Sequence, residues 1–299
     1  MAQVDIHGII NIDKPKGLTS HDVVARVRRI TGQRKTGHAG TLDPMATGVL
    51  PLALGKATRL VEYLADADKA YRATLYLGAT SETYDAEGTI TSTPEAPTPT
   101  RDAVENALNL FRGAILQIPP MHSAIKVGGQ KLYDLARQGL EIERQARAVV
   151  ITRLDLEVYK PPTVQLFVEC AKGTYIRSLA HDLGVALGTG AYLTALIRTR
   201  HGPFTLDAAI TLEGLETAFK EGTWHETLTP ADTIISGWPR HVATPEEGLR
   251  IRQGKLLQAP PPLESGDGRL AAYTQEGELL AILYWDEEKS AWQPKKVFA

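Results

Sequence analysis

Residues 37–51 read GHAGTLDPMATGVLP, the most unusual segment of the chain. Three glycines and two prolines, residue types that disfavour regular structure, surround a single carboxylate, that of Asp43. An Asp-Pro pair by itself often only starts a surface turn. The alternative interpretation is an active-site loop built to present Asp43, and the flanking sequence has to decide between the two.

Regular structure is predicted just before this loop. Residues 8–15, GIINIDKP, alternate apolar side chains and stop at a proline, which predicts a strand running into a turn. A helix is predicted to begin after a cap at Thr19 or Ser20 and to end at Gly32, because its valines and Ile30 recur at helical spacing.

After the loop, a short helix is predicted over 57–64 and a strand over 69–78, with Tyr71 on its apolar face. Further predicted elements are a helix over 101–113, paired strands over 149–159 and 163–171, and a helix within 172–188. Strands and helices do not alternate as regular βαβ units, so an α+β fold is favoured.

The composition changes after about residue 230, where short strands surround a glycine turn. We therefore expect two domains: residues 1–235, and a small β-rich domain over residues 236–299. Residues 119–147, which are polar, glycine-containing and basic, are expected to form an insertion in the first domain. A chain of 299 residues, 43% of them hydrophobic, is long enough for this arrangement.

Several classes of protein are disfavoured by the residue inventory. The single cysteine, Cys170, excludes an internal disulfide framework and a multi-cysteine zinc site. Glycine spacing around residues 48–56 and 188–190 fails both the phosphate-loop and the dinucleotide patterns, and no metal motif occurs. We expect no metal and no cofactor. No apolar run of eighteen residues and no leader pattern occur, which predicts a cytoplasmic protein without a membrane span.

Charge is distributed unevenly along the chain. Residues 1–60 contain nine basic and four acidic residues, whereas residues 61–100 contain two basic and seven acidic residues. One face of the molecule is therefore suited to a polyanion, although the formal net charge is only −2.

The motifs now resemble those of one family, the TruB family of bacterial tRNA pseudouridine-55 synthases. The resemblance rests on DKPKGLTSHDVV (13–24), the loop 37–51, KAYRATLYLG (69–78), PPMHSAIKVGGQKLYDLARQG (119–139) and KGTYIRSLAHDLG (172–184). It covers nearly the whole chain and is most specific through residue 200. It implies the pseudouridine synthase fold, in which a mixed, largely antiparallel central sheet is flanked by helices and loops, with residues 236–299 as a shortened PUA-like RNA-binding domain.

The resemblance also implies a reaction. Uridine 55 of the tRNA T loop is flipped out, detached from its ribose, rotated and rejoined through carbon. Asp43 matches the catalytic aspartate, Tyr71 a tyrosine that stacks on the base, and Arg177 an arginine that pairs with the aspartate. Three routes for Asp43 stay open: attack at C1′, attack at C6, or removal of the C2′ proton.

Further residues match substrate-binding positions of the family. Tyr175 and Leu196 match the lining of the uracil pocket, and His38 a residue beside the vacated base site. Lys14 matches a buttress of the active site. Phosphate contacts are expected among the arginines of 26–35 and at Lys126, Lys131, Arg137, Arg198 and Arg200. His122 stands where the family commonly has tyrosine.

Two other functions are less consistent with the sequence. A tRNA-binding or RNA-folding protein acting without turnover has no need for a carboxylate placed near phosphates, which argues against it. A glycoside hydrolase needs two paired carboxylates, and the motif loop holds one. The expected partner is the tRNA T stem-loop, bound by a monomer with no obligate protein partner and no membrane.

Overall fold

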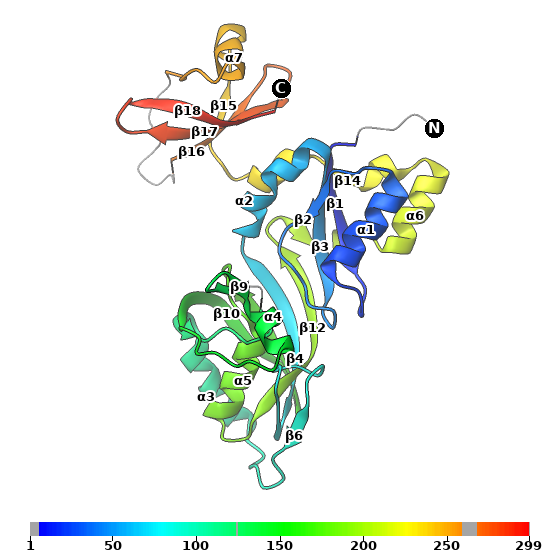
Figure 1. Cartoon of the computed structure of the whole chain (residues 1–299), viewed down its shortest axis with the longest axis vertical. Helices are drawn as coiled ribbons and strands as arrows, with labels where there is room; N and C mark the ends of the chain where they lie inside the picture. The colour runs from blue at the N-terminus through cyan, green and yellow to red at the C-terminus, as the bar shows by residue number, and fades with distance from the viewer. Residues whose placement is uncertain (1–5, 124, 259–267, 299) are drawn as a thin grey trace.

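The computed structural model describes residues 6–123, 125–258 and 268–298. Two β-sheets dominate the molecule, a large one in the body and a smaller one near the C-terminus (Figure 1). The large sheet has ten strands in the described residues, with a main path β14-β1-β3-β12-β4-β11-β10-β7. Its pairs are antiparallel except for β3 with β12, so the predicted mixed and largely antiparallel sheet is confirmed.

Four strands of this sheet were predicted from the sequence, over residues 8–15, 69–78, 149–159 and 163–171; the other six were not, and two of them lie partly within the predicted loop 37–51. In chain order the strands of the sheet are β1 Gly8–Lys14, β2 Thr36–His38, β3 Thr47–Leu54, β4 Lys69–Leu77, β7 Gly113–Gln117, β10 Arg147–Lys160, β11 Thr163–Cys170, β12 Ala191–His201, β13 Phe204–Thr205 and β14 Leu228–Thr229. Two strands, β5 Ala79–Ser81 and β6 Ile90–Ser92, form a separate hairpin.

Four of the five helices around the sheet pack on it through one continuous core, and the exception is the short helix that begins at Val61. The five helices are α1 Ser20–Thr31, α2 Val61–Ala65, α3 Arg101–Leu108, α5 Ile176–Ala186 and α6 Leu212–Glu221. The core joins valines of α1 and leucines of α5 to alternate residues of β3, Leu50 and Leu52, while Val49 and Ala53 face a second cluster on the other side. β3 is thus buried on both faces, which explains its nearly continuous apolar sequence.

The boundaries of α1 illustrate why local sequence was informative. Thr19 is the N-cap and forms a capping box with Asp22, and Gly32 ends the helix in the left-handed conformation (φ 68°). Two helix boundaries were less accurate. The helix expected over 57–64 is a 3₁₀ helix, Gly55–Leu60, followed by the short α2. The helix expected over 101–113 ends at Leu108, and a strand already begins at Gly113.

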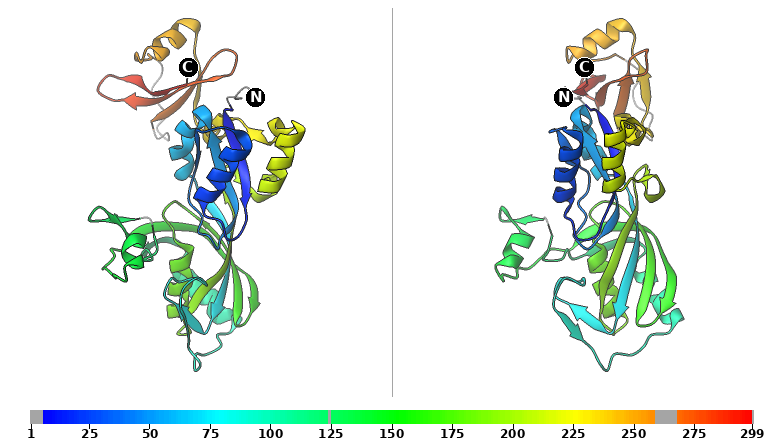
Figure 2. Two further views of the ribbon diagram at one scale, coloured as in Figure 1. Left: turned by 45° about the vertical axis from the view of Figure 1, so that its right-hand side comes forward. Right: turned by 90° about the vertical axis from the view of Figure 1, so that its right-hand side faces the viewer.

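The expected insertion lies between β7 and β10, which pair with each other. It contains the hairpin β8 Lys126–Val127 and β9 Gln130–Lys131, then α4 Leu132–Arg137. A small core of Met121, Leu132 and Leu135 holds it together. Figure 2 shows this segment projecting away from the body of the sheet.

The second sheet has the order β15-β16-β17-β18 and carries α7 (Pro245–Arg252). Its strands are β15 Arg240–Val242, β16 Arg269–Tyr273, β17 Leu279–Asp286 and β18 Ala291–Val297. A core around Trp292 and Ile251 belongs to this sheet alone. It meets the body where Tyr63 packs with Tyr273, and Lys296 lies 2.5 Å from the carboxylate of Glu62.

Candidate active site

The site gathers around three neighbouring strands in the middle of the large sheet. β12 lies between β3 and β4, and the loop that carries Asp43 leads directly into β3. Tyr71 is on β4, Leu196 is on β12, and Arg177 is in the first turn of α5. Residues more than a hundred positions apart in the sequence therefore reach one place because their strands are adjacent.

The buried ammonium group of Lys14 supports the loop that carries Asp43. The side chain of Lys14 is fully buried, and its Nζ donates to the carbonyl oxygens of Leu18 (2.6 Å), Pro15 (3.0 Å) and Pro44 (3.3 Å). Pro44 follows Asp43 directly, so Lys14 connects the end of β1 to the backbone of the acid. Burial lowers the pKa of Lys14 to about 8, against the attraction of the Asp43 carboxylate.

The other side of the loop is tied to the start of α1. The hydroxyl of Ser20 donates to the carbonyl of Leu42 (3.1 Å) and accepts from its amide (2.9 Å). The amide of Gly17 donates to the carbonyl of Pro44 (2.8 Å). Both peptide neighbours of Asp43 are thereby fixed, and its side chain is aimed by the backbone.

Arg177 holds the carboxylate that this loop presents. Its Nε lies 3.0 Å from Oδ2 of Asp43, and its Nη1 lies 3.4 Å from Oδ2 of Asp85. Its Nη2 donates to the backbone carbonyl of His122 (2.7 Å), and the side chain is only 8% exposed. The guanidinium thus joins the motif loop, the turn after β5 and the insertion. The contact from His122 comes from its backbone, so its side chain is not needed for this bond.

No role for Asp85 was predicted from the sequence. Its side chain is 2% exposed. Its Oδ1 accepts from the hydroxyl of Thr83 (2.6 Å) and the amide of Glu87 (3.0 Å). A buried acid is rare unless it is paired, and here the partner is Arg177. An acid in a glycine-containing turn gave no signal by which to choose it over its neighbours.

The environment of Asp43 contains opposing influences on its pKa. Burial raises the pKa of this carboxyl, the Arg177 guanidinium opposes that rise, and the negative charge of Asp85 adds to it. Its side chain remains 38% exposed, so a substrate can reach it. The Asp43 carboxylate is therefore accessible on one side and held by the Arg177 guanidinium on the other.

Aromatic and apolar side chains lie beside the acid. Tyr71 and Leu196, each 8% exposed, belong to the core cluster that also contains Leu42. Tyr175 precedes α5, and the side-chain amide of Gln117 clamps its backbone by donating to its carbonyl (3.1 Å) and accepting from its amide (2.7 Å). Burial raises the pKa of both tyrosines, so both are neutral phenols near pH 7.

His38 lies on β2 at the edge of this site. Its ring meets that of His21 edge-on, with centroids 5.4 Å apart, and its Nδ1 is buried without a hydrogen-bond partner in the described structure. Burial lowers the pKa of His38, and the positive charges of His21 and Arg198 lower it further. The ring is therefore neutral near pH 7.

The structure differs from several of the phosphate contacts expected from sequence. Arg198 is fully buried and donates to backbone carbonyls, so it cannot meet a phosphate at the surface. Lys14 is buried as well, and its role here is support of the loop rather than substrate contact. Arg200 pairs with Glu169 (3.2 Å). These basic side chains bind backbone carbonyls or a carboxylate of the protein itself, and the sequence pattern does not predict such partners.

Other basic residues retain exposure. Arg26 pairs with Glu213 (3.0 Å), but Arg29, Arg34 and Lys35 are exposed. The side chains of three expected contacts lie outside the described part of the structure: Lys126, Lys131 and Arg137.

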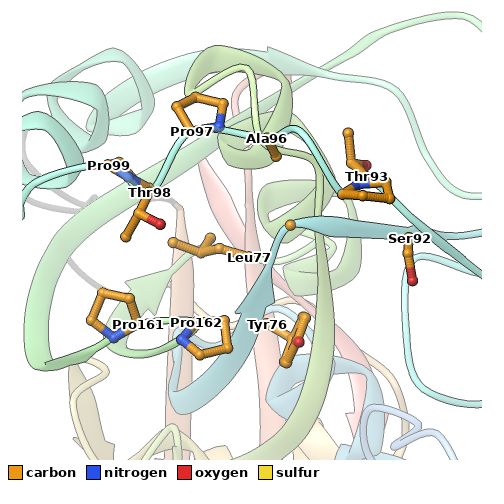
Figure 3. Close-up of a pocket in the computed structure, with 12 residues that line it drawn as sticks. Tyr76, Leu77, Ser92, Thr93, Ala96, Pro97, Thr98, Pro99, Pro161 and Pro162 are labelled. Atoms are coloured by element: carbon orange, nitrogen blue, oxygen red, sulfur yellow. The ribbon is translucent and has the colours of Figure 1, made fainter.

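Within the described ranges, no group of three or more His, Cys, Asp or Glu side chains is placed to hold a metal ion. No helix in the same ranges is long and apolar enough to cross a membrane. A hollow of about 540 Å³ does occur, but it lies at the opposite end of β4 from Tyr71, among prolines of residues 94–99 and 161–162 (Figure 3).

Comparison with known proteins decides the family. Residues 28–176 match the N-terminal domain model of the TruB family of pseudouridylate synthases, and residues 177–236 match the C-terminal domain model of tRNA pseudouridylate synthase B. A tRNA pseudouridine synthase B from Dehalococcoides mccartyi is 44% identical, over 98% of this chain and 97% of that protein. The chain belongs to the TruB family of pseudouridylate synthases.

Other TruB-family relatives and solved structures agree. The tRNA pseudouridine synthase B of Heliobacterium modesticaldum is 46% identical over 100% of this chain and 97% of that protein. The crystal structure of a Cbf5-Nop10-Gar1 complex includes a chain that superimposes with a TM-score of 0.78 at 30% identity, covering 98% of this chain and 85% of that one. The predicted fold, with its mixed central sheet and small C-terminal sheet, is that of these pseudouridine synthases.

Proposed function

We propose that this TruB-family chain is a tRNA pseudouridine synthase that isomerises uridine 55 in the T loop of tRNA. The observation that carries the proposal is the pair of Asp43 and Arg177, 3.0 Å apart, with the phenol of Tyr71 close enough for the charge of Asp43 to act on its pKa. Its relatives are named tRNA pseudouridine synthase B. Breaking and remaking a glycosidic bond needs no redox change, and the described residues offer an anionic group placed to act on a sugar or a base.

Each step of the isomerisation can be assigned to groups at this site. The bond from ribose C1′ to N1 breaks, the uracil turns, and C1′ joins C5, which then loses its proton. Asp43 acts as the nucleophile at C1′ or C6 or as the base at C2′, and all three routes begin from its ionised form. Arg177 favours that form against the effect of burial. Tyr71 and Leu196 supply the surface on which the flipped base rests.

The test is release of tritium from unmodified tRNA that carries 5-tritiated uridine, since forming the C1′–C5 bond expels the C5 hydrogen. We expect release by the wild type and none by Asp43→Asn, with tRNA affinity retained. Asp155→Asn, which alters a surface pair with Arg153, serves as the matched control and should behave as wild type. A transcript with cytidine at position 55 should release nothing.

Binding of tRNA by the wild type without any release would instead favour a tRNA-binding or folding protein acting without turnover. That alternative gives no reason for a paired, partly accessible carboxylate near the buried phenol of Tyr71. The catalytic proposal accounts for each of these features.

The proposal extends to how the substrate is held. Residues 1–235 form the catalytic domain, its insertion over 119–147 grips the T stem-loop, and residues 236–299 act as a PUA-like RNA-binding domain. Arg240, held 4.0 Å over the ring of Tyr273, and Arg269, 4.5 Å over that of Trp238, support a nucleic-acid surface there. Because tRNA is modified where it is made and used, the enzyme is assigned to the cytoplasm. It acts as a monomer without an obligate protein partner, which light scattering of the free enzyme and of its tRNA complex will test.

A further inference from the structure

Arg198 is a buried cation with an unusual set of partners. It is fully buried on β12, where its Nε donates to the carbonyl of Val49 (2.6 Å) and its Nη2 to the carbonyl of Gly40 (3.0 Å). Among the described residues no carboxylate forms an ion pair with it. A buried charge is costly without a counter-charge, so its retention needs an explanation other than packing.

The strand register places Arg198 against Tyr71. The two residues are directly opposite in the antiparallel pair of β12 and β4. Side chains of opposite residues lie on the same face, with Cβ atoms about 5 Å apart. Burial raises the pKa of the Tyr71 phenol and the nearby Arg198 guanidinium opposes that rise, as expected for two side chains that face each other across the strand pair. A guanidinium has only donors, so toward Arg198 the phenol oxygen can only accept, and its own O–H is left to donate elsewhere.

The same guanidinium is bound to the loop that carries Asp43. In the sequence, Gly40 precedes Asp43 and Val49 follows it. Lys14 supports the same stretch through its bond to the carbonyl of Pro44. Gly48 also pairs with Arg198 in the parallel ladder. Arg198 therefore connects the phenol on β4 to the frame of the catalytic loop, and so sets how the two groups are placed relative to each other.

Building on the proposed function, we propose that Arg198 is a positioning residue that holds the phenol of Tyr71 in place and directs its O–H toward the flipped base. Arginine suits this role because its planar fork serves three acceptors at once from a fixed position. Lysine has a single nitrogen and a flexible stem, so it cannot reproduce the geometry. Arg198 itself does not touch the substrate.

A double-mutant cycle tests the proposal. We compare single-turnover tritium release by Arg198→Met, Tyr71→Phe and the double variant, with tRNA affinity measured in parallel. Arg198→Met alone should slow the reaction about 100-fold, the scale expected for a group misplaced by about 1 Å, with affinity changed less than about threefold. In the Tyr71→Phe background the same change should cost less than about threefold, because the hydroxyl it positions is already gone.

If Arg198 had a purely structural role, the rate loss of the double variant would equal the product of the losses of Arg198→Met and Tyr71→Phe. That result would overturn the proposal. Arg200→Met, on the same strand but paired with Glu169, is the matched control and should keep wild-type rates. If Arg198→Met does not fold, as judged by circular dichroism, Arg198→Lys is used in the same cycle. An Arg198→Lys variant as fast as wild type also refutes the need for the fork.

A second readout is independent of turnover, so it separates this inference from the proposed function. 3-Fluorotyrosine placed at position 71 reports its own titration by fluorine NMR in the free enzyme. Burial raises the pKa of the Tyr71 phenol and the Arg198 charge opposes that rise, so the pKa should rise further in Arg198→Met and stay unchanged in Arg200→Met. Equal titration in all variants refutes the contact, whether or not the wild type releases tritium.

Discussion

The buried acid Asp85 provides the sharpest test of how the site is organised. Its Oδ2 is 3.4 Å from Nη1 of Arg177, while its Oδ1 is held by Thr83 and the amide of Glu87. The substitution Asp85→Asn keeps the shape and an oxygen acceptor but removes the charge. Arg177 then retains Asp43 and the backbone carbonyl of His122 as partners, but loses the group that fixes its far side.

The expected magnitudes follow from this arrangement. Removing one member of a buried ion pair commonly costs about 3–5 kcal/mol. Because Arg177 keeps its other partners, the lower end of that range, about 3 kcal/mol of the free energy of unfolding, is expected for Asp85→Asn. A guanidinium released on one side no longer fixes the Asp43 carboxylate to within about 1 Å, so the single-turnover rate should fall about 100-fold.

The pH dependence separates placement from charge. The negative charge of Asp85 raises the pKa of Asp43, so removing it lowers that pKa. Asp43 then stays ionised to lower pH, and the acidic limb of the rate profile moves to lower pH in Asp85→Asn. If Asp85→Asn is slower and its acidic limb lies at lower pH, the loss of rate comes from misplacement of the Asp43 carboxylate. The change in the ionisation of Asp43 by itself would favour activity.

The assay is single-turnover tritium release across a pH series, with urea unfolding for stability. Glu87→Gln is the matched control: it removes a negative charge two residues away that forms no ion pair with Arg177 in the described residues. That control should keep the rate within about threefold. Wild-type rates in Asp85→Asn, with an unmoved acidic limb, would refute the reasoning.

Three further outcomes are expected. Gly48→Ala should lower the free energy of unfolding by about 3 kcal/mol in urea titrations, because φ is 97° and an added Cβ would lie 2.3 Å from the carbonyl oxygen of Arg198; Gly37→Ala, with open space around it, should have little effect. Since the pKa of Lys14 is about 8 in the folded protein against its ordinary 10.5, the unfolded chain binds more protons between these values, so wild-type stability relative to Lys14→Met should rise over that pH range. Substituting the exposed Arg34 by Gln should weaken tRNA binding and reduce the salt slope by about 1, whereas an unchanged slope would exclude a phosphate contact.

Much of the secondary structure could be predicted because it depends on near neighbours in the chain. The alternation in residues 69–77 places Tyr71, Ala73 and Leu75 on one face, and all three belong to the main core. Thr19 and Gly32 bound α1 through caps that need only a few adjacent residues. The motif loop likewise stood out because glycine and proline are concentrated in it.

The partners of the charged groups could not be predicted, since they depend on which strands become neighbours. The sequence predicted a phosphate contact at Arg198, yet the side chain is buried opposite Tyr71 because its strand lies between β3 and β4. Asp85 carried no signal in the sequence, and only the position of α5 brings Arg177 to it. The sequence by itself determined the family, the main elements and the acid at the centre of the loop, because these depend on local pattern. Only the tertiary structure decided which cations support that acid and which are free for RNA, because burial and pairing of a charge are set by distant segments of the chain.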